Sequence, residues 1–168
     1  MILIVAYGNS LRRDDGAGFF LADALERIWI ERQREVERID THQLMPEIAQ
    51  DVAAEGVSAV VFADARVAVP REEGPGPLRI QVRRIGTDVR SPSVGHHLDP
   101  TVVMLYARLL YGKDPPAWVA TVPGVDFDHG EGLSETARSA LEFLPDILSE
   151  LGVEWPLEPS AEDLSTGR

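Results

Sequence analysis

Two short, almost wholly apolar runs constrain the fold of this chain more than any other feature. The first occupies residues 2–6 and ends in a turn at residues 7–9, and the second occupies residues 57–63, with Ser58 as its one polar residue, and ends at Asp64. Apolar runs of this length without polar alternation predict strands that are buried on both faces, as in the interior of a parallel sheet. The chain therefore needs helices to cover both faces of that sheet.

Helical periodicity alternates with the strands along the chain. Apolar residues recur every three or four positions from Asp15 onward, before Gly112 and again from Ser134, where Pro145 is expected to kink or split the helix. The other predicted elements are strands at residues 36–39, 78–82 and 118–122 and a short helix at residues 46–54. This alternation predicts an α/β fold, a three-layer sandwich with a mainly parallel central sheet and helices on both faces, in which residues 78–82 form an edge strand.

Length and composition predict one domain. The chain has 168 residues, of which 44% are hydrophobic, and this is enough for one compact core but not for two. We expect a single α/β domain over residues 1–155. Residues 156–168 are rich in proline and acidic side chains, and they predict a disordered acidic tail.

Charge and cysteine content exclude several functions. Sixteen Lys and Arg against 28 Asp and Glu give a net charge of −12, which opposes binding to nucleic acid or to an anionic membrane surface. The absence of cysteine excludes disulfides, thiolate metal sites and a cysteine nucleophile, so any metal must be bound by oxygen and nitrogen. No apolar run approaches the ~20 residues of a membrane-spanning helix, and the opening run lacks the basic flank of a signal peptide, which predicts a cytoplasmic protein.

Polar side chains follow the predicted strands where a parallel sheet places its functional cleft. Asp14 and Asp15 follow the first strand, Asp64 follows the third, and His96 and His97 precede a helix that Asp99 would cap. Two carboxylates and an imidazole at one sheet edge suit a divalent metal. Each residue also has an ordinary structural reading: helix capping for Asp14 or Asp15, a strand-end turn for Asp64, and a plain loop for the histidines. His42, after the second strand, either lines the cleft or lies in a solvated turn.

Other common sites are disfavoured. Gly8, Gly16 and Gly18 lack the dinucleotide-binding spacing, no Gly-Lys-Ser/Thr follows, and two aspartates at a helix start disfavour phosphate, so no nucleotide cofactor is expected. Ser10 lacks the second glycine of a nucleophile elbow. The chain also has no His-Glu-x-x-His helix, the usual signature of a zinc protease.

The motifs together resemble those of the hydrogenase maturation proteases. Residues 8–18 read Gly-Asn-Ser-Leu-Arg-Arg-Asp-Asp-Gly-Ala-Gly and are similar to the opening motif of that family. Its later landmarks follow in order at residues 60–65, 96–100 and 127–134, so the resemblance spans about residues 1–150.

The resemblance implies a metal-dependent hydrolase, described as an aspartyl-type endopeptidase. Such an enzyme removes a C-terminal extension from the precursor of a nickel-iron hydrogenase large subunit, after nickel insertion. The family's catalytic and metal-contacting positions fall on Asp15, Asp64 and His96, with His97 as the alternative to His96. The nickel would be supplied by the precursor, held by the precursor's own cysteines. The alternative is a non-catalytic nickel-binding checkpoint protein that recognises the loaded precursor.

Overall fold

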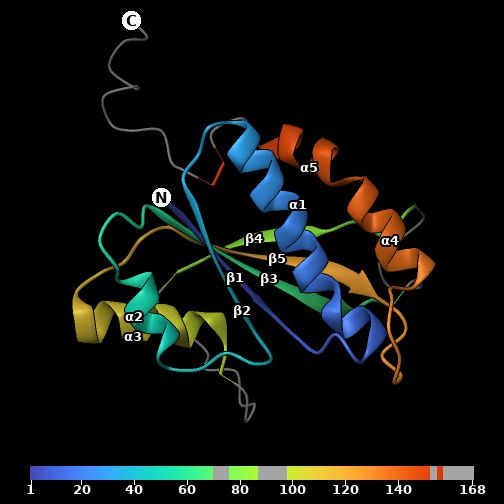
Figure 1. Ribbon diagram of the computed structural model, residues 1–168, viewed down its shortest axis with the longest axis horizontal. Helices are drawn as coiled ribbons and strands as arrows, with labels where there is room; N and C mark the ends of the chain where they lie inside the picture. Colours follow the sequence, from blue (N-terminus) through green and yellow to red (C-terminus); the bar gives the residue numbers. More distant parts are fainter. Residues whose placement is uncertain (70–75, 87–97, 152–154, 157–168) are drawn as a thin grey trace, which may run out of the picture.

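The central sheet is mainly parallel, as the sequence predicts. The computed structural model describes residues 1–69, 76–86, 98–151 and 155–156. Within these residues, five strands form one sheet in the order β2-β1-β3-β5-β4 (Figure 1). The neighbouring pairs β1–β2, β1–β3 and β3–β5 are parallel, and β4 is antiparallel to β5 at one edge. The strands are β1 (Ile2–Tyr7), β2 (Val36–Thr41), β3 (Ala59–Val67), β4 (Gln81–Ile85) and β5 (Ala117–Gly124).

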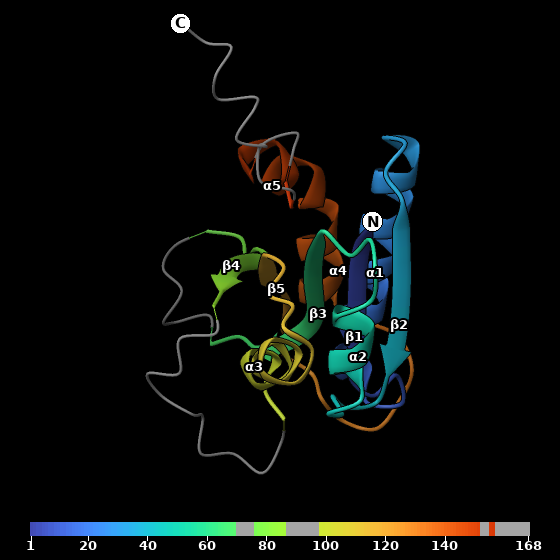
Figure 2. The same ribbon diagram turned by 90° about the vertical axis from the view of Figure 1, so that its left-hand side faces the viewer.

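Helices cover both faces of the sheet and make three layers. Helices α1 (Ala17–Glu31), α4 (Glu135–Glu142) and α5 (Leu144–Leu151) lie on one face, and α2 (Ile48–Val52) and α3 (Pro100–Tyr111) lie on the other (Figures 1 and 2). Strand β1 shows why two covers are needed. Its Ile2, Ile4 and Ala6 belong to the core under α1, whereas Leu3 and Val5 belong to the core under α2 and α3. Among the described residues, no helix is long and apolar enough to cross a membrane.

Several predicted boundaries are wrong, and pairing explains two of them. Strand β3 does not stop before Asp64 but continues to Val67, because β5 pairs with it as far as Gly124. The edge strand lies at Gln81–Ile85 instead of residues 78–82, because its pairing with β5 brings the buried Ile85 opposite Ala117.

The ends of two helices also bear on the predictions. The helix expected from Asp15 begins at Ala17, after a 3-10 turn η1 (Arg13–Gly16), and no side chain caps it. The predicted split near Pro145 is confirmed, since α4 ends at Glu142 and α5 begins at Leu144. His96, His97 and residues 157–168 of the predicted tail lie outside the described residues.

Gly18 allows α1 to approach β3 closely. A Cβ atom on Gly18 would lie 2.5 Å from the carbonyl oxygen of Ala63 and 2.9 Å from the Cα of Asp64. Both atoms belong to backbone in the middle of the sheet, so neither can move aside cheaply. The close packing of α1 against β3 beside Asp64 thus explains why the opening motif has glycine at position 18.

We expect Gly18→Ala to destabilise the chain by about 2 kcal/mol, even though alanine favours helix by up to about 1 kcal/mol over glycine. The measurement is urea unfolding. Gly86→Ala is the control, because a Cβ there meets no atom of the described residues within 4 Å, and it should leave stability nearly unchanged. A Gly18→Ala variant as stable as the natural chain would show that the close approach of α1 to β3 does not matter.

Candidate active site

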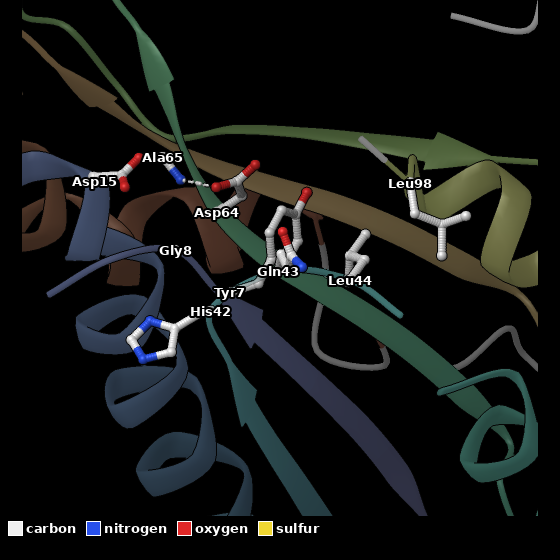
Figure 3. Close-up of a pocket in the computed structure, with 9 residues that line it drawn as sticks. All are labelled: Tyr7, Gly8, Asp15, His42, Gln43, Leu44, Asp64, Ala65 and Leu98. Atoms are coloured by element: carbon white, nitrogen blue, oxygen red, sulfur yellow. Dashed lines mark hydrogen bonds between the residues drawn. The ribbon is translucent and has the colours of Figure 1, made fainter. Parts of the chain in front are cut away.

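A pocket of about 540 Å³ opens at the carboxyl ends of β1, β2 and β3 (Figure 3). The chain leaves β1 for β2 on one side, and β3 lies on the other side of β1. This divergence creates a crevice, the usual place for a functional site in an open α/β sheet. The residues that line the pocket are Tyr7, Gly8, Asp15, His42, Gln43, Leu44, Asp64, Ala65 and Leu98.

The glycine-rich turn after β1 places Asp15 in the pocket. The backbone N–H of Asn9 donates a hydrogen bond to Asp15 Oδ2 at 3.1 Å. Gly8 has a φ of +141°, and a Cβ on it would lie 2.0 Å from the carbonyl oxygen of Asp15. Only glycine therefore allows the turn to fold back against Asp15. The turn thus positions a carboxylate.

Asp64 enters the pocket from β3, beside the end of β1. The backbone N–H of Ala65 donates a hydrogen bond to its Oδ1 at 2.7 Å (Figure 3). The pKa of Asp64 is raised to about 6: burial raises it most, the negative charge of Asp15 also raises it, and interactions with the Tyr7 hydroxyl and the Ala65 N–H partly offset the rise. The Asp15 and Asp64 carboxylates therefore repel each other, and a cation bound between them would relieve that repulsion.

The structure brings together two of the three predicted site residues. Asp15 and Asp64 line the same pocket, as does His42, whose position the sequence left open. Asp15, Asp64 and His42 do not form a metal site by themselves, since the described part of the chain contains no group of three potential metal ligands. Ser10 is not among the lining residues. The assignment of His96 as the third metal contact stays a prediction, because His96 lies outside the described residues.

Asp14 does not line the pocket; it has a structural role next to it. Its side chain is fully buried and accepts hydrogen bonds from the backbone N–H groups of Val125, Asp126 and Ser134 at 2.7–3.0 Å. The Ser134 hydroxyl donates a fourth at 2.7 Å. Burial alone would raise the pKa of Asp14, but these hydrogen bonds outweigh it and hold the pKa below its ordinary value. Asp14 thus ties the turn after β1 to the loop after β5 and does not cap α1.

Tyr7, Gln43 and Leu44 also line the pocket, although they were not among the site residues predicted from the sequence. A usable signal existed for Tyr7. Tyr7 directly follows the first apolar run, as Asp64 follows the second, and the parallel pairing of their strands places both positions at one edge of the sheet. Gln43 and Leu44 carried no such signal, because their position depends on the path of the chain between β2 and α2.

Comparison with solved structures finds the same fold in hydrogenase maturation enzymes. The hydrogenase-maturating endopeptidase HybD from E. coli matches with a TM-score of 0.64 and 24% identity, over 89% of this chain and 91% of that chain. The nickel-iron hydrogenase maturation protease HycI from Thermococcus kodakarensis matches with a TM-score of 0.61 and 22% identity, over 89% and 90%. The chain has the fold of the hydrogenase maturation proteases.

A third match agrees with the first two. The hydrogenase 2 maturation peptidase from a Thaumarchaeota archaeon has a TM-score of 0.58 and 19% identity, over 91% of this chain and 99% of that chain. No sequence profile of a known family and no curated protein sequence matches the chain. The resemblance seen in the motifs is thus confirmed at the level of the fold.

Proposed function

We propose that this chain is a hydrogenase maturation endopeptidase, which removes the C-terminal extension from the nickel-loaded precursor of a nickel-iron hydrogenase large subunit. The observation that carries the proposal is the pairing of Asp15 and Asp64 in one pocket at the switch point of the sheet. The motif resemblance assigns metal contact to the same two residues. The same fold in two hydrogenase maturation proteases supports the proposed activity.

In the proposed mechanism the nickel belongs to the substrate and is not a cofactor of this chain. Asp15, Asp64 and His96 would contact the nickel held by the precursor and so place the scissile peptide bond in the pocket. The substrate's metal would polarise the scissile carbonyl or lower the pKa of a water molecule. The chain's own residues position the groups that contact the metal. The Asn9 N–H fixes the Asp15 carboxylate, and the Ala65 N–H fixes the Asp64 carboxylate, before the substrate binds.

The composition of the pocket supports attack by water. None of its described lining residues is a serine, a threonine or a cysteine. A covalent acyl intermediate would need such a nucleophile beside a base. Hydrolysis directed by the substrate's metal needs none.

The histidine doublet gives a test of this assignment. We expect His96→Ala to reduce cleavage of the nickel-loaded precursor by on the order of 100-fold or more, because it removes a metal contact. His97→Ala, its matched control, should retain cleavage within a few-fold. The intact mass of the precursor over time measures both. Full cleavage by His96→Ala with loss in His97→Ala would move the contact to His97, and full cleavage by both would remove histidine from the proposed mechanism.

A further inference from the structure

The segment that joins β2 to α2 forms one wall of the pocket. Its residues His42, Gln43 and Leu44 line the pocket together with Asp15 and Asp64 (Figure 3). The His42 ring points away from the two carboxylates in this view. Leu44 is only 6% exposed and belongs to the core under α2 and α3, whereas Gln43 is exposed. Leu44 therefore anchors the segment, and Gln43 is left to face the pocket.

Hydrogen bonds hold this segment on both sides of Gln43. The backbone N–H of Gly8 donates to the carbonyl oxygen of Thr41 at 3.3 Å, which joins the segment to the turn after β1. The Thr41 hydroxyl donates to the main-chain carbonyl oxygen of Gln43 at 2.9 Å. Further along, the N–H of Ile48 in α2 donates to the carbonyl oxygen of Met45 at 3.2 Å. The main chain at Gln43 is thus fixed before a substrate binds.

The Gln43 carboxamide has no hydrogen-bond partner among the residues that the structure describes. Within those residues, Gln43 takes part in one hydrogen bond, which its main-chain carbonyl oxygen accepts from Thr41. A carboxamide carries N–H donors and a carbonyl acceptor, the same groups as a peptide unit. The ionised carboxylates of Asp15 and Asp64 can accept hydrogen bonds but cannot donate them. Gln43 therefore offers the pocket a donor that the two carboxylates cannot supply.

We propose that Gln43 is a substrate-binding residue, and that its carboxamide pairs with a peptide group of the substrate's main chain next to the scissile bond. The inference rests on the proposed function, in which a peptide bond of the precursor lies in this pocket. The amide N–H donates to a substrate carbonyl, and the amide oxygen accepts from a substrate N–H. Main-chain hydrogen bonds of this kind give affinity for an extended peptide without selecting its side chains.

The first experiment compares Gln43→Met with Gln50→Met in the full chain, with nickel-loaded large-subunit precursor as substrate. Methionine keeps the length of the side chain but removes the amide, and Gln50 is exposed on α2 and does not line the pocket. We expect Gln43→Met to lower kcat/KM by about 10-fold, mainly by raising KM, because the contact is present before and during cleavage alike. Gln50→Met should change neither constant. Unchanged constants in Gln43→Met, or a fall in kcat alone, would overturn the binding role.

A second experiment determines which part of the substrate Gln43 contacts. Two further precursors carry alanine at the residue before the cut or at the residue after it. Each is cleaved by the natural chain and by Gln43→Met. Pairing with the main chain predicts the same loss of about 10-fold for every precursor. A loss that disappears with one alanine precursor would place the contact on that side chain and overturn main-chain pairing.

Thermal unfolding gives a readout that does not depend on activity. Because the carboxamide has no partner among the described residues, Gln43→Met should change the Tm by less than about 2 °C. A larger loss would mean that the amide holds the fold, and it would overturn the binding role while the proposed function stands. If the natural chain does not cut the precursor at all, the proposed function fails and the binding role falls with it.

Discussion

Replacing Asp64 with asparagine is expected to abolish cleavage and to stabilise the folded chain at pH 8. Cleavage should fall by on the order of 10²–10³-fold, because asparagine keeps the shape of the side chain but loses the charge that contacts the substrate's metal in the proposed mechanism. Stability should rise because asparagine is not charged in its partly buried position beside Asp15. Opposite effects on activity and stability distinguish a functional carboxylate from a structural one.

The gain in stability depends on pH in a defined direction. Burial raises the pKa of Asp64 from 3.8 to about 6 in the folded chain. The favourable contribution of the protonated carboxyl is complete below about pH 4 and is lost as the pH rises through 6. We expect Asp64→Asn to be more stable than the natural chain by about 1–2 kcal/mol at pH 8, after allowance for partial solvent exposure, and to lose this advantage at pH 4.

Urea unfolding at the two pH values measures this difference. Asp51→Asn is the matched control, because Asp51 is exposed on α2 and does not line the pocket, and it should change neither stability nor cleavage. An Asp64→Asn variant that is less stable than the natural chain at pH 8 would mean that Asp64 is a structural carboxylate.

Replacing Asp14 with asparagine should have the opposite effect on stability to Asp64→Asn. Its carboxylate accepts four hydrogen bonds from Val125, Asp126 and Ser134. In Asp14→Asn, the amide NH₂ must face at least one of these donors, so buried groups lose their partner. We expect a loss of about 2–4 kcal/mol in the free energy of unfolding at pH 7, one of the largest effects of any single substitution in this chain.

The pH dependence of this loss follows from the lowered pKa of Asp14. Its stabilising contribution is present above about pH 4 and is lost as the pH falls through the folded-state pKa. The stability difference between the natural chain and Asp14→Asn should therefore narrow below pH 4 in urea unfolding. Asp128→Asn, at an exposed position of the same loop, should change stability by less than about 0.5 kcal/mol. Equal stability of Asp14→Asn and the natural chain at pH 7 would show that the hydrogen-bond cluster is dispensable.

The architecture could be predicted from the sequence because its signals are local. The run that became β1 is apolar on both faces, and this pattern alone requires helices above and below the sheet. The exact end of β3 and the shift of β4 to Gln81–Ile85 depend on pairing with β5, which is far away along the chain. The local sequence pattern does not determine where a strand ends when its end depends on pairing with a distant strand.

The site was predictable where strand ends mark it. Asp15 and Asp64 follow apolar strands, and the structure places both in the pocket. The different roles of the adjacent Asp14 and Asp15 could not be read from their spacing, because Asp14 is distinguished by donors at Val125 to Ser134, more than 100 residues away. Tertiary hydrogen bonds thus distinguish the buried, structural Asp14 from Asp15, which lines the pocket.

The most direct test of the central claim is the intact mass of a hydrogenase large-subunit precursor after incubation with the full chain. Nickel-loaded and nickel-free forms of the same precursor are compared. The account predicts that the loaded form alone loses a C-terminal peptide. Equal cleavage of both forms would contradict recognition through the substrate's nickel. Binding of the loaded form without any cleavage would contradict the protease assignment and favour a checkpoint protein.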